Sequence, residues 1–482
     1  MIDSKKKLFR WGPIDATMLF LGYPMVSSFS EMKELFGVCY PEAVVIYDKD
    51  QAIWICENQK IEDASNEFAE QNIIPDRKRE RFYSFWKKSV KALLGIQKEI
   101  NNFHLEKLDD KNIGKVFLKW SKSYLDFWKI GMSAELVNYG LEGKLKNILK
   151  NHTQEERDFN KAFSVLSTPD KMSFYKEEEE DLMAIVLQDK KKQEKKLSKH
   201  QKNYFWMLNN YFSAKELNVD YFKKKAKNAT KGVARKFLKE AKNYQQKVKD
   251  EKKKYIKRLN LNNKKVKVIQ LLNEAIIFQD KRKMHNLKAD YYLEEFLKEF
   301  SKRKVVPVRD LKWLLPKELE KLAEGEDAKQ LIAKRKHIAV AVCDDKKIEI
   351  KVQNIASKIN IDLNEVKIEK SSNIQGTVAC IGKEKHFRGI ARIILSPKEG
   401  NKLKEGEILV TAMTTPDYVV FMKKAGAIIT DIGGVTCHAA VVSREFGIPC
   451  IVGTKHATKI IKDGDILEIH NLRGVVKIVN SA

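Results

Sequence analysis

The sequence predicts a multidomain α+β protein, with a small mixed α/β segment at the N-terminus, a large mostly helical middle and a C-terminal unit of strands and turns. Its 482 residues are too many for one ordinary hydrophobic core. Glycine marks the main boundary: twelve of the 22 glycines follow residue 370, while only Gly232 and Gly325 lie between 151 and 330. Because helices disfavour glycine and tight turns need it, a helical middle precedes a turn-rich end.

The first predicted region is a small mixed α/β segment at residues 1–75. It contains two β-rich runs, 43–47 and 52–56, around an Asp-Lys-Asp-Gln turn, which is the pattern of a hairpin. From Pro75 onward the apolar residues recur with helical spacing. We therefore predict a helical domain over residues 76–335.

The helical region carries most of the net positive charge. The apolar and aromatic residues within 237–259 recur at the spacing of a helix-packing face. The amphipathic pattern that follows predicts a second helix that returns along the first, so a basic helical hairpin is expected. Residues 186–304 hold 35 Lys and Arg against 13 Asp and Glu, a net +22 within a chain of +27. Such a patch attracts nucleic acid, anionic lipid or phosphorylated ligands, but lysine dominates it, and we favour a solvated face.

A connector is predicted at residues 336–370. It begins with a second hairpin around Asp344 and Asp345. Residues 353–370 then mix acidic and basic side chains with few apolar anchors. We interpret them as a hinge.

The C-terminal unit, residues 371–482, alternates short apolar runs with turn residues. One helix is expected to begin at Thr415 and Pro416, and a second to run from Thr436 to Glu445, stopped by Gly447. The predicted strands are 390–395, 408–411, 427–430, 450–452, 466–469 and 475–479.

His438 is the main candidate for chemistry. Gly433 and Gly434 follow a predicted strand and precede a helix, so backbone N–H groups can approach an anion there. A helix start disfavours the imidazolium, and a neutral ring keeps the lone pair that a nucleophile needs. We expect His438 to be phosphorylated, with room for an anion around its ring and with Gly433, Gly434, Thr436 (as the N-cap) and Cys437 stabilising the phosphate. The alternative is a histidine that only caps the helix.

Two other groups of residues are candidate sites. Arg282, His285, Lys288 and Tyr292 recur at helical spacing and predict either an acceptor pocket or a hydrated helix face. Cys437, His438 and Cys450 fit no zinc spacing and lack a fourth ligand, so no metal site is predicted.

The compartment is predicted from cysteine usage. Six scattered cysteines form no CxxC pair, as in proteins of a reducing cytoplasm. No apolar run approaches the ~20 residues of a membrane-spanning helix. The basic and apolar N-terminus resembles a secretion signal only loosely, because glycine and proline interrupt it. We expect a cytoplasmic protein.

The segment TDIGGVTCHAAVVSREFGIPC at 430–450 closely resembles the swivelling phosphohistidine domain of phosphoenolpyruvate-utilising enzymes. That family includes pyruvate phosphate dikinase, phosphoenolpyruvate synthase and rifampicin phosphotransferase. Similar segments at 376–382, 402–411, 424–431 and 461–469 extend the resemblance over 371–482. It implies a compact β/β/α fold with His438 as the phosphorylated histidine. Residues 288–322 and 331–342 resemble, more weakly, the helical acceptor-binding domain of rifampicin-phosphotransferase-like members.

The sequence also departs from that family. Its members usually carry an ATP-grasp domain, and the dikinases and synthases add a barrel that binds phosphoenolpyruvate. The first 370 residues show no Gly-rich phosphate loop and no ATP-grasp pattern, and the chain ends shortly after the swivelling domain. We therefore expect a phosphotransferase component whose donor, ATP or phosphoenolpyruvate, is bound by a separate subunit.

The resemblance places the cofactors on that partner. An ATP-grasp kinase subunit would hold ATP and Mg, no cofactor is assigned to this chain, and the small-molecule acceptor cannot be read from the sequence. The alternative hypothesis is a non-catalytic regulatory or nucleic-acid-binding protein that retains the domain.

Overall fold

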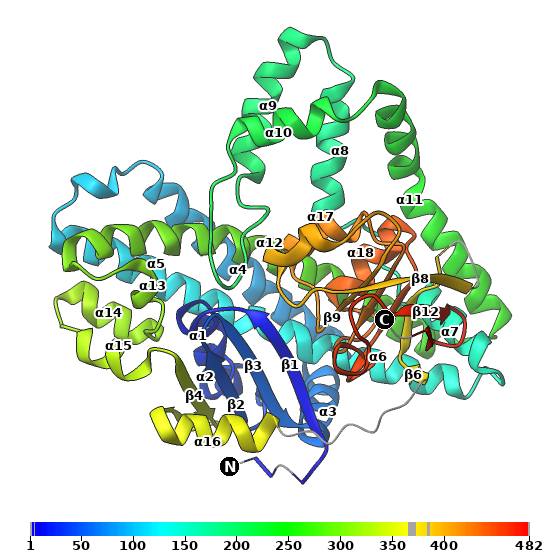
Figure 1. Ribbon diagram of the computed structural model, residues 1–482, viewed down its shortest axis with the longest axis horizontal. Coiled ribbons are helices and arrows are strands. Elements are labelled where there is room, and N and C mark those ends of the chain that lie inside the picture. The colour runs from blue at the N-terminus through cyan, green and yellow to red at the C-terminus, as the bar shows by residue number, and fades with distance from the viewer. Residues whose placement is uncertain (1, 4, 365–372, 383–385, 481–482) are drawn as a thin grey trace. The chain divides into compact units, whose positions relative to one another are not determined.

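The computed structural model describes residues 2, 3, 5–364, 373–382 and 386–480 (Figure 1). The chain divides into two units that each draw on several stretches of sequence. The first unit comprises Met1–Leu141, Asn210–Ser213 and Ala289–Glu369, and the second comprises Glu142–Asn209, Ala214–Lys288 and Lys370–Ala482. Helices α6 (Ser133–Lys150) and α12 (Asn263–Lys304) contribute residues to both units. The four consecutive regions expected from the sequence stay a prediction.

The first unit contains an antiparallel sheet of five strands in the order β1-β3-β2-β4-β5. Both predicted hairpins are confirmed, and they belong to one sheet because β2 pairs with β4, with Val45 opposite Ala341. The strands are β1 (Leu8–Asp15), β2 (Ala43–Asp48), β3 (Gln51–Glu57), β4 (Ile338–Cys343) and β5 (Ile348–Val352).

Part of the predicted connector is a helix. Residues Gln353–Asn364 form α16, which packs Ala356, Ile359 and Leu363 against Val44 and Val340 of the sheet. These three apolar residues follow helical spacing, a pattern that was missed under the charged composition. Residues 365–370 of the predicted hinge lie outside the described part of the chain.

The remaining helices of the first unit surround aromatic and aliphatic side chains. Helix α4 buries Phe82, Trp86 and Leu93, as the helical spacing after Pro75 predicts. These helices are α1 (Met18–Ser27), α2 (Ser30–Phe36), α3 (Asn58–Phe68), α4 (Asp76–Ile100), α5 (Asp110–Gly131), α13 (Val308–Leu311), α14 (Pro316–Glu324) and α15 (Lys329–Arg335), with short turns at Ala69–Ile73 and Leu105–Lys107.

The second unit begins with helices. The predicted hairpin helices are present as α11 (Lys231–Arg258) and α12, whose long ribbons are drawn in green in Figure 1. The others are α7 (Glu156–Leu166), α8 (Phe174–Val186), α9 (Lys190–Tyr204) and α10 (Val219–Lys227).

An eight-stranded mixed sheet completes the second unit, in the order β6-β13-β12-β8-β9-β10-β11-β7. Five of the six predicted strands lie where expected, and the first, predicted at 390–395, is displaced to His386–Ile393. Strands β6 and β7 were missed because they are three and four residues long. The strands are β6 (Asn373–Gln375), β7 (Thr377–Cys380), β8 (His386–Ile393), β9 (Ile408–Thr411), β10 (Ala427–Thr430), β11 (Cys450–Val452), β12 (Ile466–His470) and β13 (Val475–Asn480). Short helical segments lie at Pro397–Lys402, Pro416–Tyr418, α17 (Val419–Met422), α18 (His438–Phe446) and α19 (Ala457–Ile460).

The centre of this sheet is parallel and covered on both faces. Strands β8 to β11 pair in parallel, and every residue of β9, β10 and β11 is buried. Ile408 and Ile429 enter one apolar cluster, while Leu409 and Ile428 enter another that includes residues of α18. Successive side chains of a strand point to opposite faces, so α18 covers one face of the sheet.

Among the described residues, no helix combines the length and the apolar character that crossing a membrane requires.

Candidate functional site

The site is built on the loop between β10 and α18. Gly433 has a φ of +119°, and a Cβ at this position would lie 2.7 Å from the Sγ of Cys437. Both the backbone conformation and the close approach therefore require glycine. The turn brings His438 to the first residue of α18, as the sequence predicts.

Side chains beyond both ends of the loop hold it in place. Asp431 accepts a hydrogen bond from the backbone N–H of Thr458 at 3.0 Å. The half-buried guanidinium of Arg444 donates to the carbonyls of Val435 at 2.6 Å and of Ala379 at 2.8 Å. These contacts fix the path of the backbone that presents His438.

The helix start differs from the prediction in one respect. Cys437, not Thr436, is the N-cap residue, and no side chain caps the helix. The hydroxyl of Thr436 instead donates to Oε2 of Glu142 at 3.4 Å. Burial raises the pKa of the Cys437 thiol, which stays protonated and is a poor nucleophile.

A carboxylate lies beside the glycine loop where the sequence predicts a phosphate. A Cβ on Gly434 would meet the two carboxylate oxygens of Glu142 at 2.5 and 2.6 Å. Glu142 is buried and pairs with Lys146 at 2.8 Å. Gly434 and Thr436 thus lie against a carboxylate of the protein itself, and a role of Gly433, Gly434, Thr436 and Cys437 in stabilising a phosphate stays a prediction.

The two nitrogens of the His438 ring have different surroundings. Nδ1 lies 2.8 Å from the hydroxyl oxygen of Thr414. Nε2 is buried and has no hydrogen-bond partner among the residues that the structure describes. If Thr414 donated to Nδ1, the proton on Nε2 would be a buried orphan donor, which is rarer in proteins than an orphan acceptor. The geometry favours a proton on Nδ1 and a lone pair on Nε2.

His438 is more buried than the sequence predicts. The residue is 7% exposed, and the ring of Tyr175 on α8 lies edge-on to it with centroids 5.8 Å apart. The expectation of open space for an anion around the ring is therefore wrong for this conformation. Local sequence carries no signal of this burial, because Thr414 and Tyr175 come from other segments of the chain.

Burial keeps the His438 imidazole neutral. It is the main cause that lowers the pKa of the ring well below its usual value, and the positive charge of Lys283 on α12 adds to it. The neutral state agrees with the prediction, but its main cause is burial, whereas the prediction rested on the helix dipole. Lys283 was not predicted, because it is not one of the candidate acceptor residues that share a face of α12.

A half-buried carboxyl lies at the other end of α18. Glu445 accepts hydrogen bonds from both the backbone N–H and the hydroxyl of Ser173, each at 2.7 Å. Burial, as the main cause, raises its pKa to about 7. Asp280 on α12, which accepts from the N–H of Phe174 at 3.0 Å, has its pKa raised by burial to about 7 as well. Neither carboxyl was predicted from the sequence.

The predicted acceptor residues on α12 fall into both units. Arg282 is 1% exposed, burial lowers the pKa of His285 to about 4, and burial also lowers the pKa of Lys288. These three belong to the second unit, whereas Tyr292 belongs to the first, where its hydroxyl donates to Asn101 at 3.0 Å. The structure does not assign the four residues to one unit.

Comparison with known proteins covers the region of this loop. Residues 403–474 match the family described as "PEP-utilising enzyme, mobile domain". The chain is 57% identical over 88 residues to a probable phosphoenolpyruvate synthase of Archaeoglobus fulgidus, covering 18% of this chain and 12% of that protein. It is 48% identical over 134 residues to a probable phosphoenolpyruvate synthase of Staphylothermus marinus, covering 27% and 15%.

A third relative is the phosphoenolpyruvate synthase of Pyrococcus furiosus, 57% identical over 84 residues, which cover 17% of this chain and 10% of the relative. The chain thus covers only 10–15% of the length of these curated relatives.

Proposed function

We propose that this chain is a phosphotransferase component in which His438 carries a phosphoryl group, because residues 403–474 match the mobile domain of the PEP-utilising enzymes. The observation that carries the proposal is the state of the His438 ring. Its imidazole is neutral, its Nδ1 is hydrogen-bonded to Thr414, and its Nε2 has no hydrogen-bond partner among the described residues. A nucleophile needs this free lone pair.

The proposed chemistry consists of two transfers. In the first, the Nε2 lone pair attacks the phosphorus of the donor, a P–N bond forms, and the P–O bond to the leaving group breaks. The Nδ1 proton stays in its hydrogen bond to Thr414 and stabilises the charge that develops on the ring. In the second, an oxygen of the acceptor attacks the same phosphorus and the P–N bond breaks, which restores the neutral histidine.

Phosphoryl transfer requires the covering residues to move. Tyr175 and Glu142 lie against the His438 ring and its glycine loop, and a phosphate dianion there would meet the carboxylate of Glu142. We propose that the C-terminal β/β/α domain swivels away from α6 and α8, so that Nε2 reaches a donor in one position and an acceptor in another.

The donor, acceptor and partner are further parts of the proposal. A separate ATP-grasp kinase subunit would bind ATP and Mg and charge His438, with phosphoenolpyruvate as the other candidate donor. The helical region would hold the small-molecule acceptor, and the roles of Arg282, His285, Lys288 and Tyr292 stay predictions. We place this reaction in the cytoplasm.

The test is the state of His438 in the chain recovered from the cells that make it. Under conditions that preserve phosphohistidine, mass spectrometry of the peptide containing His438 should show a phosphate that is lost in acid and kept in alkali. His438→Ala should abolish this modification, and the control His104→Ala, at an exposed site of the other unit, should keep it. An unmodified wild-type peptide, or equal modification of the His438→Ala chain, would contradict the proposal.

The net +22 of residues 186–304 supports a second candidate, a nucleic-acid-binding protein that retains the domain. Its lysines on α9 and α11 are mostly exposed. Binding to RNA or DNA that falls steeply with salt and is unchanged by His438→Ala, in a chain without phosphohistidine, would favour this function instead.

A further inference from the structure

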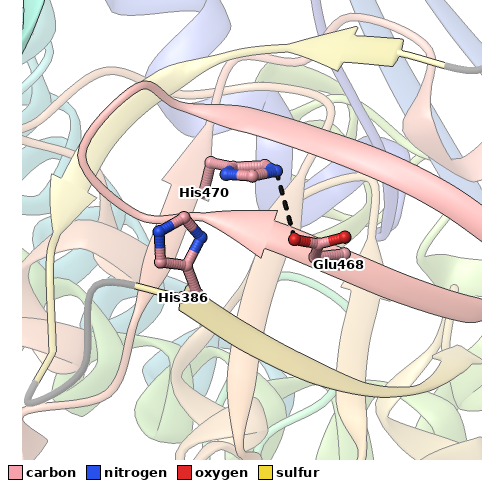
Figure 2. A group of neighbouring side chains, drawn as sticks. All are labelled: His386, Glu468 and His470. Atoms are coloured by element: carbon pink, nitrogen blue, oxygen red, sulfur yellow. Dashed lines mark ion pairs between the residues drawn. The ribbon is translucent and has the colours of Figure 1, made fainter.

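Three side chains that can bind metals meet on one face of the sheet in the second unit. His386 is the first residue of β8, and Glu468 and His470 lie at the end of β12 (Figure 2). One potential ligand atom from each residue lies within 4.8 Å of the other two. The site lies outside the loop that carries His438, and the proposed function does not use it.

The strand register brings these residues together. His386 and His470 are directly paired across the antiparallel strands β8 and β12. Glu468 precedes His470 by two residues, so both point to the same face, while the intervening Ile469 is 1% exposed and packs into the core on the other face. The polar cluster therefore follows from a sheet with one buried face.

The polar atoms of the cluster converge. Nε2 of His470 is buried, lies 3.4 Å from Oε1 of Glu468, and has no hydrogen-bond partner among the described residues. The ring of His386 stands edge-on to that of His470, with centroids 4.7 Å apart and planes at 85°. In Figure 2 the three side chains gather at the same end of the two strands.

Ordinary surface pairing explains only part of this arrangement. Arg388 and Lys477 stand opposite Glu468 on the two neighbouring strands, and a carboxylate between two cations is a common cross-strand pairing. Those cations do not account for two imidazoles in contact, since protonated histidines would repel each other. A cation that binds both rings in their neutral form accounts for both histidines and for the carboxylate.

We propose that His386, Glu468 and His470 bind a divalent transition-metal ion of the zinc type. Two imidazoles and one carboxylate are a ligand set that suits Zn²⁺, and a water molecule would take the fourth position of such an open site. Ligands at about 2.0–2.1 Å from a tetrahedral ion are about 3.4 Å apart. The Nε2–Oε1 distance already has this value, and the exposed side chain of His386 can close the remaining separation.

Such an ion would link the beginning of β8 to the end of β12. This site could not be predicted from the sequence, because His386 is far along the chain from Glu468 and His470 and only the pairing of β8 with β12 brings the three together.

The test is calorimetric titration of ZnCl₂ into the full chain, prepared without a histidine tag and stripped of metal. The wild type should bind one equivalent. His386→Gln and Glu468→Gln should each weaken binding about tenfold or more, because losing a ligand costs at least as much as losing an outer-shell partner. Both side chains reach the surface, so these variants should fold, which thermal unfolding in the absence of metal would check.

The chain offers a matched control in His104 and Glu106. This pair has the same separation of two residues and an Nδ1–Oε1 distance of 3.3 Å, on an exposed segment of the other unit. His104→Gln should leave zinc binding unchanged.

Two results would overturn the proposal: a wild type that binds no zinc, or His386→Gln and Glu468→Gln chains that bind it like the wild type. A third possibility is that the ion binds to a cysteine. Titration with Co²⁺ in place of zinc tests it, because a thiolate ligand produces a charge-transfer absorption band. Such a band would also overturn the proposal.

Discussion

One hydrogen bond decides which nitrogen of His438 can react. Thr414 Oγ1 and His438 Nδ1 are 2.8 Å apart and both residues are buried, so water does not compete for the bond. A buried bond of this kind sets the tautomer of the ring as well as its orientation. In the proposed reaction Thr414 would therefore act through the histidine, as a positioning residue.

We predict that Thr414→Val, which keeps the shape of the side chain and removes its hydroxyl, lowers the rate of phosphoryl incorporation at His438 about tenfold. The lost bond is worth about 1.4 kcal/mol, and that energy corresponds to a factor of ten. Thr415→Val is the control, because the hydroxyl of Thr415 donates to Asp417 and not to the ring. NMR of the ring nitrogens should show the fixed tautomer in wild type and a mixture in Thr414→Val. An unchanged rate with an unchanged tautomer would refute the role of Thr414.

At the scale of elements, the loop from β10 to α18 is shaped by backbone constraints. Gly433 provides a positive φ and a close approach to Cys437, while Asp431 and Arg444 hold the flanking backbone. The helix itself is short, from His438 to Phe446, and ends at Gly447 with φ +67°. The loop is therefore specified more by contacts than by helix propensity.

Substitution of Gly433 should reveal this. We predict that Gly433→Ala destabilises the second unit by about 1–3 kcal/mol and abolishes most phosphoryl incorporation, because the Cβ would meet Cys437 Sγ in a strained backbone. Gly447→Ala is the matched control: its φ is also positive, but a Cβ there meets nothing within 4 Å, and it should cost only about 1 kcal/mol. Urea unfolding measures the loss of stability in both variants. Equal effects of the two substitutions would mean that the contact with Cys437 contributes nothing.

At the scale of the whole molecule, the helical part of the second unit and its sheet domain each contribute a half-buried carboxyl group. Ser173 at the start of α8, Asp280 on α12 and Glu445 on α18 belong to this unit, and both carboxyls have a pKa raised by burial to about 7. Carboxyls with raised pKa values bind more protons in the folded state than in the unfolded state between pH 4.5 and 7. Their contribution to stability is complete below that window and is lost as the pH rises to about 7.

We predict that the second unit of the wild type loses about 2 kcal/mol more stability between pH 5 and pH 7 than that of Glu445→Gln, because the variant lacks one of these carboxyls. The comparison is needed because His285, whose pKa burial lowers to about 4, acts in the opposite direction as the pH falls. Hydrogen exchange of the α18 amides measures the stability of this unit. Glu62→Gln, at an exposed position of the first unit, should follow the wild type. Parallel pH profiles of the wild type and Glu445→Gln would contradict the prediction.

The sequence by itself determined the features that depend on neighbouring residues. Alternating and continuous apolar runs located the strands from β8 to β13, and the two glycines before Thr436 located the start of α18 and its histidine. Local pattern suffices there, because side-chain periodicity and backbone freedom are properties of short segments. The resemblance of 371–482 agrees with the matched family region, 403–474.

Only the tertiary structure decided which distant groups meet. Thr414, Tyr175, Lys283 and Glu142 reach the His438 region from four separate segments, and they set its tautomer, burial and charge. His386 likewise meets His470 only through the pairing of β8 with β12. Contacts of this kind depend on how helices and strands pack, which local periodicity does not encode, so the position of His438 at the start of a helix could be predicted while its surroundings could not.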